Sequence, residues 1–166
     1  MNINKYIINN NNIIKILIER ILINMQNNNI ELLNSIYQNA KMGSENIAQL
    51  LPKINDQNFQ STLMNQLSKY QDIANQANKM LTDLNCSPKK CMVDTLTSKA
   101  CITFNTLTNT STSHIAEMMI TGNTMGVIDI TKKLNQTPHC KEDVCNLCTN
   151  LIELEENSAE NLKQFL

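Results

Sequence analysis

The residues with the most distinctive chemistry in this chain are its six cysteines: Cys86, Cys91, Cys101, Cys140, Cys145 and Cys148. Five of them follow two spacings, Cys86-x4-Cys91 and Cys140-x4-Cys145-x2-Cys148, and His139 adjoins the second group. Thiolate and imidazole ligands at tetrahedral angles suit Zn, so these five thiols and His139 form a candidate metal site. Cu(I) and an iron–sulfur cluster are the less expected cofactors. Because only one Cys-x2-Cys knuckle is present, the pattern is not that of a zinc ribbon.

Thiol redox chemistry is a second interpretation of the same group. Cys140 is expected near a helix N-terminus, where the helix dipole favours the thiolate and raises reactivity. Cys145 and Cys148 lie three residues apart on one helix face, with β-carbons about 5–6 Å apart. That separation suits two arms of a metal clamp but exceeds the spacing of about 3.8 Å that a direct disulfide needs.

Simple packing is the third interpretation, since cysteine is a common small buried residue. Cys148 falls on an apolar stripe, and Cys101 stands alone. Cys86 and Cys91 flank a helix start at Ser87, where a pair of packed apolar residues is expected. The sequence leaves these three interpretations of the cysteines open.

Long helices must position these residues, because the 166-residue chain contains only three Gly, three Pro and no Trp. A chain of this length fits one domain. Apolar residues in steps of three and four predict an all-α fold with four long helices and a shorter, less regular helical segment. The long helices are predicted at residues 30–51, 57–84, 113–134 and 140–165, and the shorter segment at 88–107. Asp56 is a predicted N-cap, Pro52 a predicted stop, and Asn28 with Glu31 resembles a capped start.

Residues 1–29 differ from the rest and are predicted to form an N-terminal extension to a single bundle domain at 30–166. Two Asn runs flank an Ile-rich stretch that carries Lys15, Glu19 and Arg20. Three interpretations stay open. In the first, the true start is Met25 and the stretch upstream of it is not part of the protein. In the second, the stretch is an extra helix that packs on the bundle or on a partner. In the third, it lies on a membrane surface. A surface helix normally has a richer Lys/Arg face, and the apolar run is too short to span a bilayer.

Helix order indicates a specific connectivity. If each long helix spans the bundle and the 88–107 segment crosses back, the helices at 57–84 and 113–134 run parallel, as in ferritin-like bundles. Residues 30–51, IELLNSIYQNAKMGSENIAQLL, resemble the first helix of uncharacterised bacterial ferritin-like proteins. Residues 105–134, containing TSTSHIAEMMITGNTMGVIDITKKL, resemble their third helix. NAKMGSENIAQLL with FQSTLMNQLSKYQ is similar to the spore coat F-like branch. The resemblance covers residues 30–166 and implies a ferritin-like four-helix bundle.

The di-iron chemistry of that superfamily is not expected here. Its sites use a Glu on each of two helices and Glu-x-x-His on the other two. This chain contains no Glu-x-x-His, and His114-x-x-Glu117 has the reverse order. Glu45 and Glu155 are isolated candidates. We therefore predict a non-catalytic bundle with a structural or interaction role, with Zn as its candidate cofactor.

Charge and motifs exclude several other classes. The formal net charge is −1 and Arg20 is the only arginine, so no basic stripe exists for nucleic acid. No Ser/His/Asp grouping, phosphate loop or nucleotide fingerprint indicates another enzyme class. Without a convincing secretory signal we expect a cytoplasmic protein with mostly reduced thiols, and the resemblance adds spore association as an alternative. Self-association or a protein partner is expected, and a membrane partner is not.

Overall fold

The computed structural model describes residues 3–89 and 109–166, which are all-α, as predicted. The long helices are α1 (Ile3–Leu50), α2 (Gln57–Asp83), α4 (Thr112–Asn135) and α5 (Glu142–Leu162). Short 3-10 turns follow at Leu51–Lys53 and Lys163–Phe165, and this part of the chain contains no strand. None of the described helices is both long and apolar enough to cross a membrane. From residue 90 on, the helical segment predicted at 88–107 lies outside the described residues.

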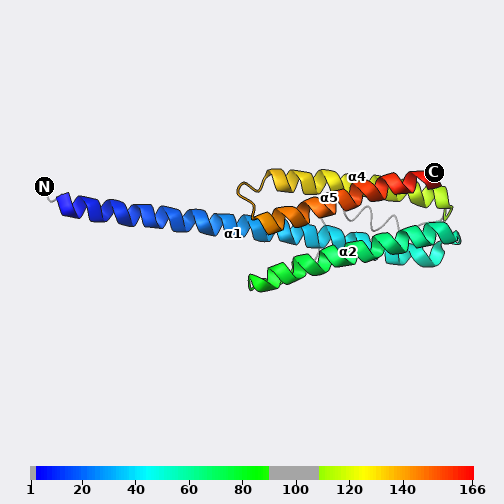
Figure 1. Cartoon of the computed structure of the whole chain (residues 1–166), viewed down its shortest axis with the longest axis horizontal. Coiled ribbons are helices and arrows are strands. Elements are labelled where there is room, and N and C mark those ends of the chain that lie inside the picture. The colour runs from blue at the N-terminus through cyan, green and yellow to red at the C-terminus, as the bar shows by residue number, and fades with distance from the viewer. Residues whose placement is uncertain (1–2, 90–108) are drawn as a thin grey trace.

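Two helical hairpins make the bundle (Figure 1). α1 and α2 form one antiparallel pair, and α4 and α5 form the other. Between the two hairpins, α2 packs on α5 and α4 packs on α1. α2 and α4 run in the same direction, so α2 ends at the end of the bundle where α5 begins. This is the parallel placement predicted for these two helices, and it brings Cys86, after α2, and Cys140, before α5, to one end of the bundle.

Local chemistry sets the boundaries between α1 and α2 as predicted. α1 ends at Leu50, and Pro52 lies inside the 3-10 turn that follows it. Proline cannot continue an α-helix because it lacks the backbone N–H and clashes with the preceding turn. The Asp56 carboxylate then accepts the backbone N–H groups of Asn58 and Phe59 at 2.9 and 3.0 Å. Two of the four unpaired donors at the start of α2 are thereby satisfied.

The C-terminus of α2 is closed by a residue in the left-handed region, Asn85, whose φ is 57°. Its N–H donates to the carbonyl of Thr82, and the next N–H, from Cys86, donates to Leu81, each at 2.8 Å. This pair of bonds is the Schellman motif, in which asparagine substitutes for glycine at modest cost. Cys86 follows the turn and packs half-buried against the core.

The core is built from the apolar stripes of all four helices. Its largest fully buried side chains include Tyr70, Phe59, Leu63, Leu81, Ile130 and Leu151. Burying a side chain of this size stabilises the fold by about 1.5–3 kcal/mol. Phe59 at the start of α2 also meets the ring of Phe165, in the turn after α5, at 4.7 Å between centroids. This contact joins α2 to the C-terminal end of the chain, at the end of the bundle away from Cys140.

α1 differs from its prediction because it begins at Ile3 rather than near residue 30. The predicted N-cap, Asn28, lies inside the helix. The helix continues through this asparagine run, and the amide of the neighbouring Asn29 donates to the helical carbonyl of Met25 at 2.6 Å. At 48 residues, α1 is about 72 Å long, and its N-terminal part projects beyond the other helices (Figure 1).

Candidate functional site

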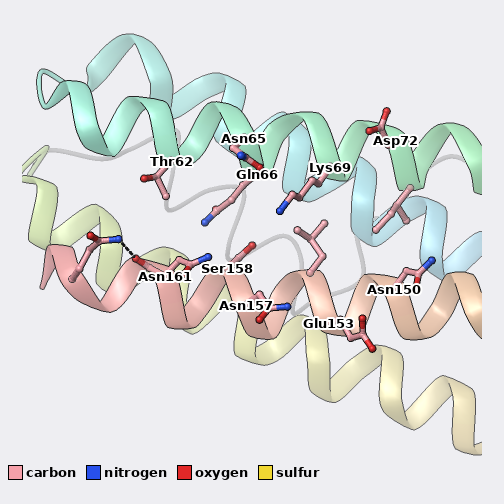
Figure 2. Close-up of a pocket in the computed structure, with 13 residues that line it drawn as sticks. Thr62, Asn65, Gln66, Lys69, Asp72, Asn150, Glu153, Asn157, Ser158 and Asn161 are labelled. Carbon is pink, nitrogen blue, oxygen red and sulfur yellow. Dashed lines mark hydrogen bonds between the residues drawn. The ribbon is translucent and has the colours of Figure 1, made fainter.

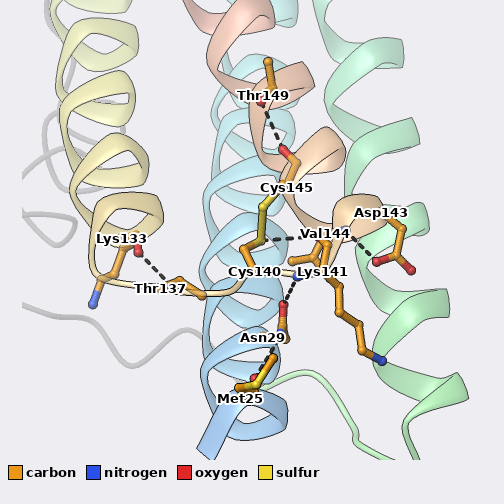
Figure 3. Close-up of a disulfide and its surroundings, with 10 residues drawn as sticks. All are labelled: Met25, Asn29, Lys133, Thr137, Cys140, Lys141, Asp143, Val144, Cys145 and Thr149. Carbon is orange, nitrogen blue, oxygen red and sulfur yellow. Dashed lines mark hydrogen bonds between the residues drawn. A yellow bond between two sulfur atoms is a disulfide. The ribbon is translucent and has the colours of Figure 1, made fainter.

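The cysteine group before and within α5 contains a disulfide between Cys140 and Cys145, whose Cα atoms are 5.9 Å apart (Figure 3). Lys141, between them, is the N-cap residue of α5, and its carbonyl accepts the N–H of Cys145 at 2.8 Å. The pair therefore bridges the turn before α5 to the first turn of the helix. Cys140 lies just before the helix N-terminus, as predicted, and Cys145 is paired with it rather than with Cys148.

The remaining described cysteines lie in packed positions. Cys148 is fully buried on the core stripe, as predicted, and burial raises the pKa of its thiol to about 11. A thiol held protonated in this way is a weak nucleophile and a poor metal ligand. Cys86 is half-buried after the α2 turn, and its thiol lies 3.6 Å from the carbonyl of Leu84.

Five members of the predicted metal site lie within the described residues: Cys86 after α2, and His139, Cys140, Cys145 and Cys148 around the start of α5. In these residues no group of three or more His, Cys, Asp or Glu side chains has the arrangement that holds a metal ion. His139 is exposed in the α4–α5 turn, with a φ of 59°. Cys91 and Cys101 lie outside the described residues, so the Zn site of Cys86, Cys91, Cys140, Cys145, Cys148 and His139 stays a prediction.

Two buried asparagines on α1 fix the segments that surround this end. The side-chain oxygen of Asn29 accepts the N–H of Lys141 at 2.8 Å, and that of Asn34 accepts the N–H of Lys89 at 2.7 Å. Each amide group donates to the carbonyl four residues earlier, so both ends of each side chain are used. A buried asparagine of α1 thus anchors each segment: Asn29 holds the start of α5 (Figure 3), and Asn34 holds the chain after α2.

A polar layer crosses the middle of the bundle. The Tyr70 hydroxyl of α2 donates to the side-chain oxygen of Asn123 on α4 at 3.2 Å, and both side chains are buried. Gly43 on α1 makes room for the tyrosine, because a β-carbon there would lie 2.9 Å from Cε1 of the ring. Burial, with a smaller contribution from the Glu155 charge, holds the pKa of Tyr70 well above 10.

Glu155 on α5 is the buried carboxyl of this layer, with 2% of its surface exposed. Burial, with a smaller contribution from the Asp129 carboxylate, raises its pKa to about 8. Gly126 on α4 accommodates the carboxyl group, since a β-carbon there would lie 2.7 Å from Cδ of Glu155. Glu155 is therefore mainly neutral at neutral pH, a form that burial tolerates far better than the anion.

A groove of about 520 Å³ lies between α2 and α5 (Figure 2). Its lining is dominated by carboxamides and hydroxyls, with one lysine, two acidic residues and two apolar side chains: Thr62, Asn65, Gln66, Lys69, Asp72, Ile73, Asn150, Glu153, Leu154, Asn157, Ser158, Asn161 and Gln164. Gln66 is buried and points from α2 towards α5. This groove was not predicted from the sequence.

The other sequence candidates are scattered. Glu45 is exposed and paired with Lys41 at 3.3 Å. His114 and Glu117 lie in the first turns of α4, where Ser111 caps the N–H of His114. The polar residues that sequence reasoning missed, Gln66, Asn29 and Asn123, share one signal. Each occupies a position on an apolar stripe, where a polar residue has to find a partner or a function.

Comparison of the chain with protein-family models, with curated proteins and with solved structures yields no match. The resemblance of residues 30–51 and 105–134 to ferritin-like helices therefore stays a prediction. The all-α fold with parallel α2 and α4 stands independently of it.

Proposed function

We propose that this chain is a non-catalytic, ferritin-like helical bundle with a structural role, and that it associates with a second copy through the projecting part of α1. The observation that carries the proposal is an uncovered apolar surface. Eight large side chains in this part of α1 are each 48–58% exposed: Ile13, Ile14, Ile16, Leu17, Ile18, Ile21, Leu22 and Ile23.

Part of this surface continues the face that α1 buries in the bundle. Ile14, Ile18 and Ile21 follow each other in steps of four and three. The same steps lead on through Met25 and Asn29 to Leu32, which is fully buried. Residues at this spacing lie on one side of a helix. From Ile14 on, α1 therefore carries one apolar stripe, and the other helices cover only the later part of it.

The uncovered stripe is large enough for a specific contact. Two copies paired along it would remove on the order of 1,000 Å² from water, about the size at which specific interfaces begin. Its few charges are mixed, with Lys15 and Arg20 against Glu19, so two copies would not repel strongly. A membrane-surface helix would carry a richer cationic face, and these charges favour a second copy over a lipid surface.

The ferritin-like part of the proposal is supported by connectivity. Parallel second and third long helices require a connection that returns along the bundle, and this is the arrangement of ferritin-like folds. In the described chain α2 and α4 are these two helices.

The mass of the full-length chain in solution, measured by light scattering after size exclusion, tests the proposal. The test variant replaces Ile14, Ile18 and Ile21 by Gln. Glutamine has a good helix propensity, so α1 should persist while the apolar stripe is lost. The control replaces three exposed apolar residues of the bundle, Met64, Met125 and Ile128, by Gln. We expect the wild type and the control to be dimeric and the test variant to be monomeric. A monomeric wild type, or a test variant that stays dimeric, would refute the proposal.

A thiol-redox role is the second candidate, favoured by the Cys140–Cys145 disulfide. Oxidation of the two thiols by a low-molecular-weight disulfide would form this bond and release two thiols. In a glutathione redox titration followed by alkylation and peptide mass spectrometry, both cysteines should change together. If Cys140 and Cys145 become alkylated independently of each other, the redox candidate is contradicted. If the two thiols are protected from alkylation only when Zn is added, the predicted metal site is favoured instead.

A further inference from the structure

We propose that the groove between α2 and α5 binds a neutral polyhydroxylated small molecule, a sugar or sugar alcohol, with Gln66 as its central anchor. The proposal is independent of self-association, because the groove lies on the bundle rather than on the projecting part of α1 (Figures 1 and 2).

Gln66 is the observation that points to a ligand. Only 5% of its surface is exposed, yet neither its side-chain oxygen nor its side-chain nitrogen has a hydrogen-bond partner among the described residues. A buried carboxamide with both ends unpaired is costly, because it has lost its water without replacing the hydrogen bonds. Figure 2 shows its side chain directed from α2 into the space before α5. A ligand that offers a donor and an acceptor side by side would satisfy both ends.

The rest of the lining matches hydroxyl groups. Each side-chain amide of Asn65, Asn150, Asn157 and Asn161 offers both donors and an acceptor. A hydroxyl is likewise both a donor and an acceptor, so each hydroxyl of a polyol can donate a hydrogen bond to such an amide or accept one from it. Of the charged side chains, one lysine stands against two carboxylates, Asp72 and Glu153, which disfavours phosphates and other anions.

The groove also has a small apolar part. Ile73 on α2 and Leu154 on α5 belong to the lining, and both are largely buried. A sugar ring presents carbon-bound hydrogens on its faces and hydroxyls around its edge. The two apolar side chains can contact a ring face while the surrounding amides take the edge. The volume of about 520 Å³ lies within the range of small-molecule sites, roughly 300–1,000 Å³.

The test uses the full-length chain and a panel of neutral probes: glucose, galactose, mannose, N-acetylglucosamine, inositol and sorbitol. Binding is followed by amide chemical shifts in NMR spectra at millimolar probe. We expect at least one probe to shift amides of α2 and α5 around Gln66 in a saturable way. Phosphate, as an anionic probe, should not compete.

The variant Gln66→Leu separates binding from folding. It removes two unpaired polar atoms at nearly constant size, so we expect a melting temperature at or above that of the wild type and a loss of affinity of about tenfold or more. Gln76→Leu, on an exposed position of α2 outside the groove, is the matched control and should leave affinity unchanged. The proposal is overturned if no probe shifts these amides, if Gln66→Leu binds like the wild type, or if Gln66→Leu markedly lowers the melting temperature.

Discussion

The side-chain oxygen of Asn29 on α1 accepts the backbone N–H of Lys141 at 2.8 Å, across 112 positions of the sequence. The Asn29 amide also donates to the carbonyl of Met25. We predict that Asn29→Leu lowers the free energy of unfolding by about 0.5–1.5 kcal/mol, because the partly buried N–H of Lys141, the N-cap residue of α5, loses its partner. Urea denaturation measures the change. Asn27→Leu, at an exposed position of the same helix, is the control, and equal effects of the two substitutions would contradict the anchoring role of Asn29.

The two glycines of α4 should respond oppositely to alanine. A β-carbon at Gly126 meets the Glu155 carboxyl, whereas one at Gly122 meets nothing within 4 Å. We expect Gly126→Ala to destabilise the fold by about 1–3 kcal/mol through overpacking. Gly122→Ala should stabilise it by up to about 1 kcal/mol through helix propensity. Thermal unfolding of the two variants side by side measures both effects. A Gly126→Ala variant that is more stable than the wild type would show that the Glu155 carboxyl does not need the space beside Gly126.

The raised pKa of Glu155 makes stability depend on pH. Its pKa is 4.5 ordinarily and about 8 in the fold, so between these values the folded chain holds a proton that the unfolded chain has released. The stabilisation is fully present below pH 4.5 and is lost as pH rises through about 8, with a slope of at most about −1.4 kcal/mol per pH unit. Urea denaturation between pH 5 and 9 measures this slope.

Glu155→Gln provides the control for that slope, because the amide has nearly the same shape and does not titrate. The variant should lose most of the decline in stability between pH 5 and 9. Asp129 and Tyr70 are the titratable groups that interact with Glu155. Asp129→Asn should therefore lower the pKa of Glu155 in the fold, so that the decline ends at a lower pH and is smaller in total. A Glu155→Gln variant with the full wild-type slope would assign the effect to other groups.

The disulfide closes a short loop before α5. Cys140 and Cys145 are five residues apart, and the chain-entropy model gives a loop of this length about 2 kcal/mol of stabilisation. We predict that reduction lowers the free energy of unfolding by about that amount, and that the double variant Cys140→Ser/Cys145→Ser becomes insensitive to reductant. If the double variant still responds to reductant as the wild type does, a different pair of cysteines is responsible.

The helices were predictable because their signals are local. Pro52 stops α1 and Asp56 caps the start of α2, and both act on neighbouring backbone groups. The start of α1 was predicted wrongly because an asparagine run is a typical capping signal, whereas in the fold Asn29 bonds within the helix and to a distant segment. The Asn29–Lys141 contact depends on tertiary placement, which local patterns do not carry.

In the candidate sites too, features set by local sequence patterns were predictable, and features set by tertiary packing were not. Cys148 was predicted to be buried, since it lies on a regular stripe, and Glu155 was named only as an isolated carboxyl. That Gly126 makes room for it depends on which helices become neighbours. The groove of Gln66 was missed because Leu67 beside it continues the stripe equally well, and only the three-dimensional packing decides which of the two side chains faces α5.

Sedimentation equilibrium of the wild-type chain, over a wide range of concentration and in the presence of reductant, tests self-association through α1 most directly. The predicted result is a reversible equilibrium between the 18.8 kDa chain and a species of twice that mass. This dimer should disappear when Ile14, Ile18 and Ile21 are replaced by Gln. A mass of 18.8 kDa at every concentration would show that the uncovered stripe of α1 does not join two copies, and would contradict the proposed function.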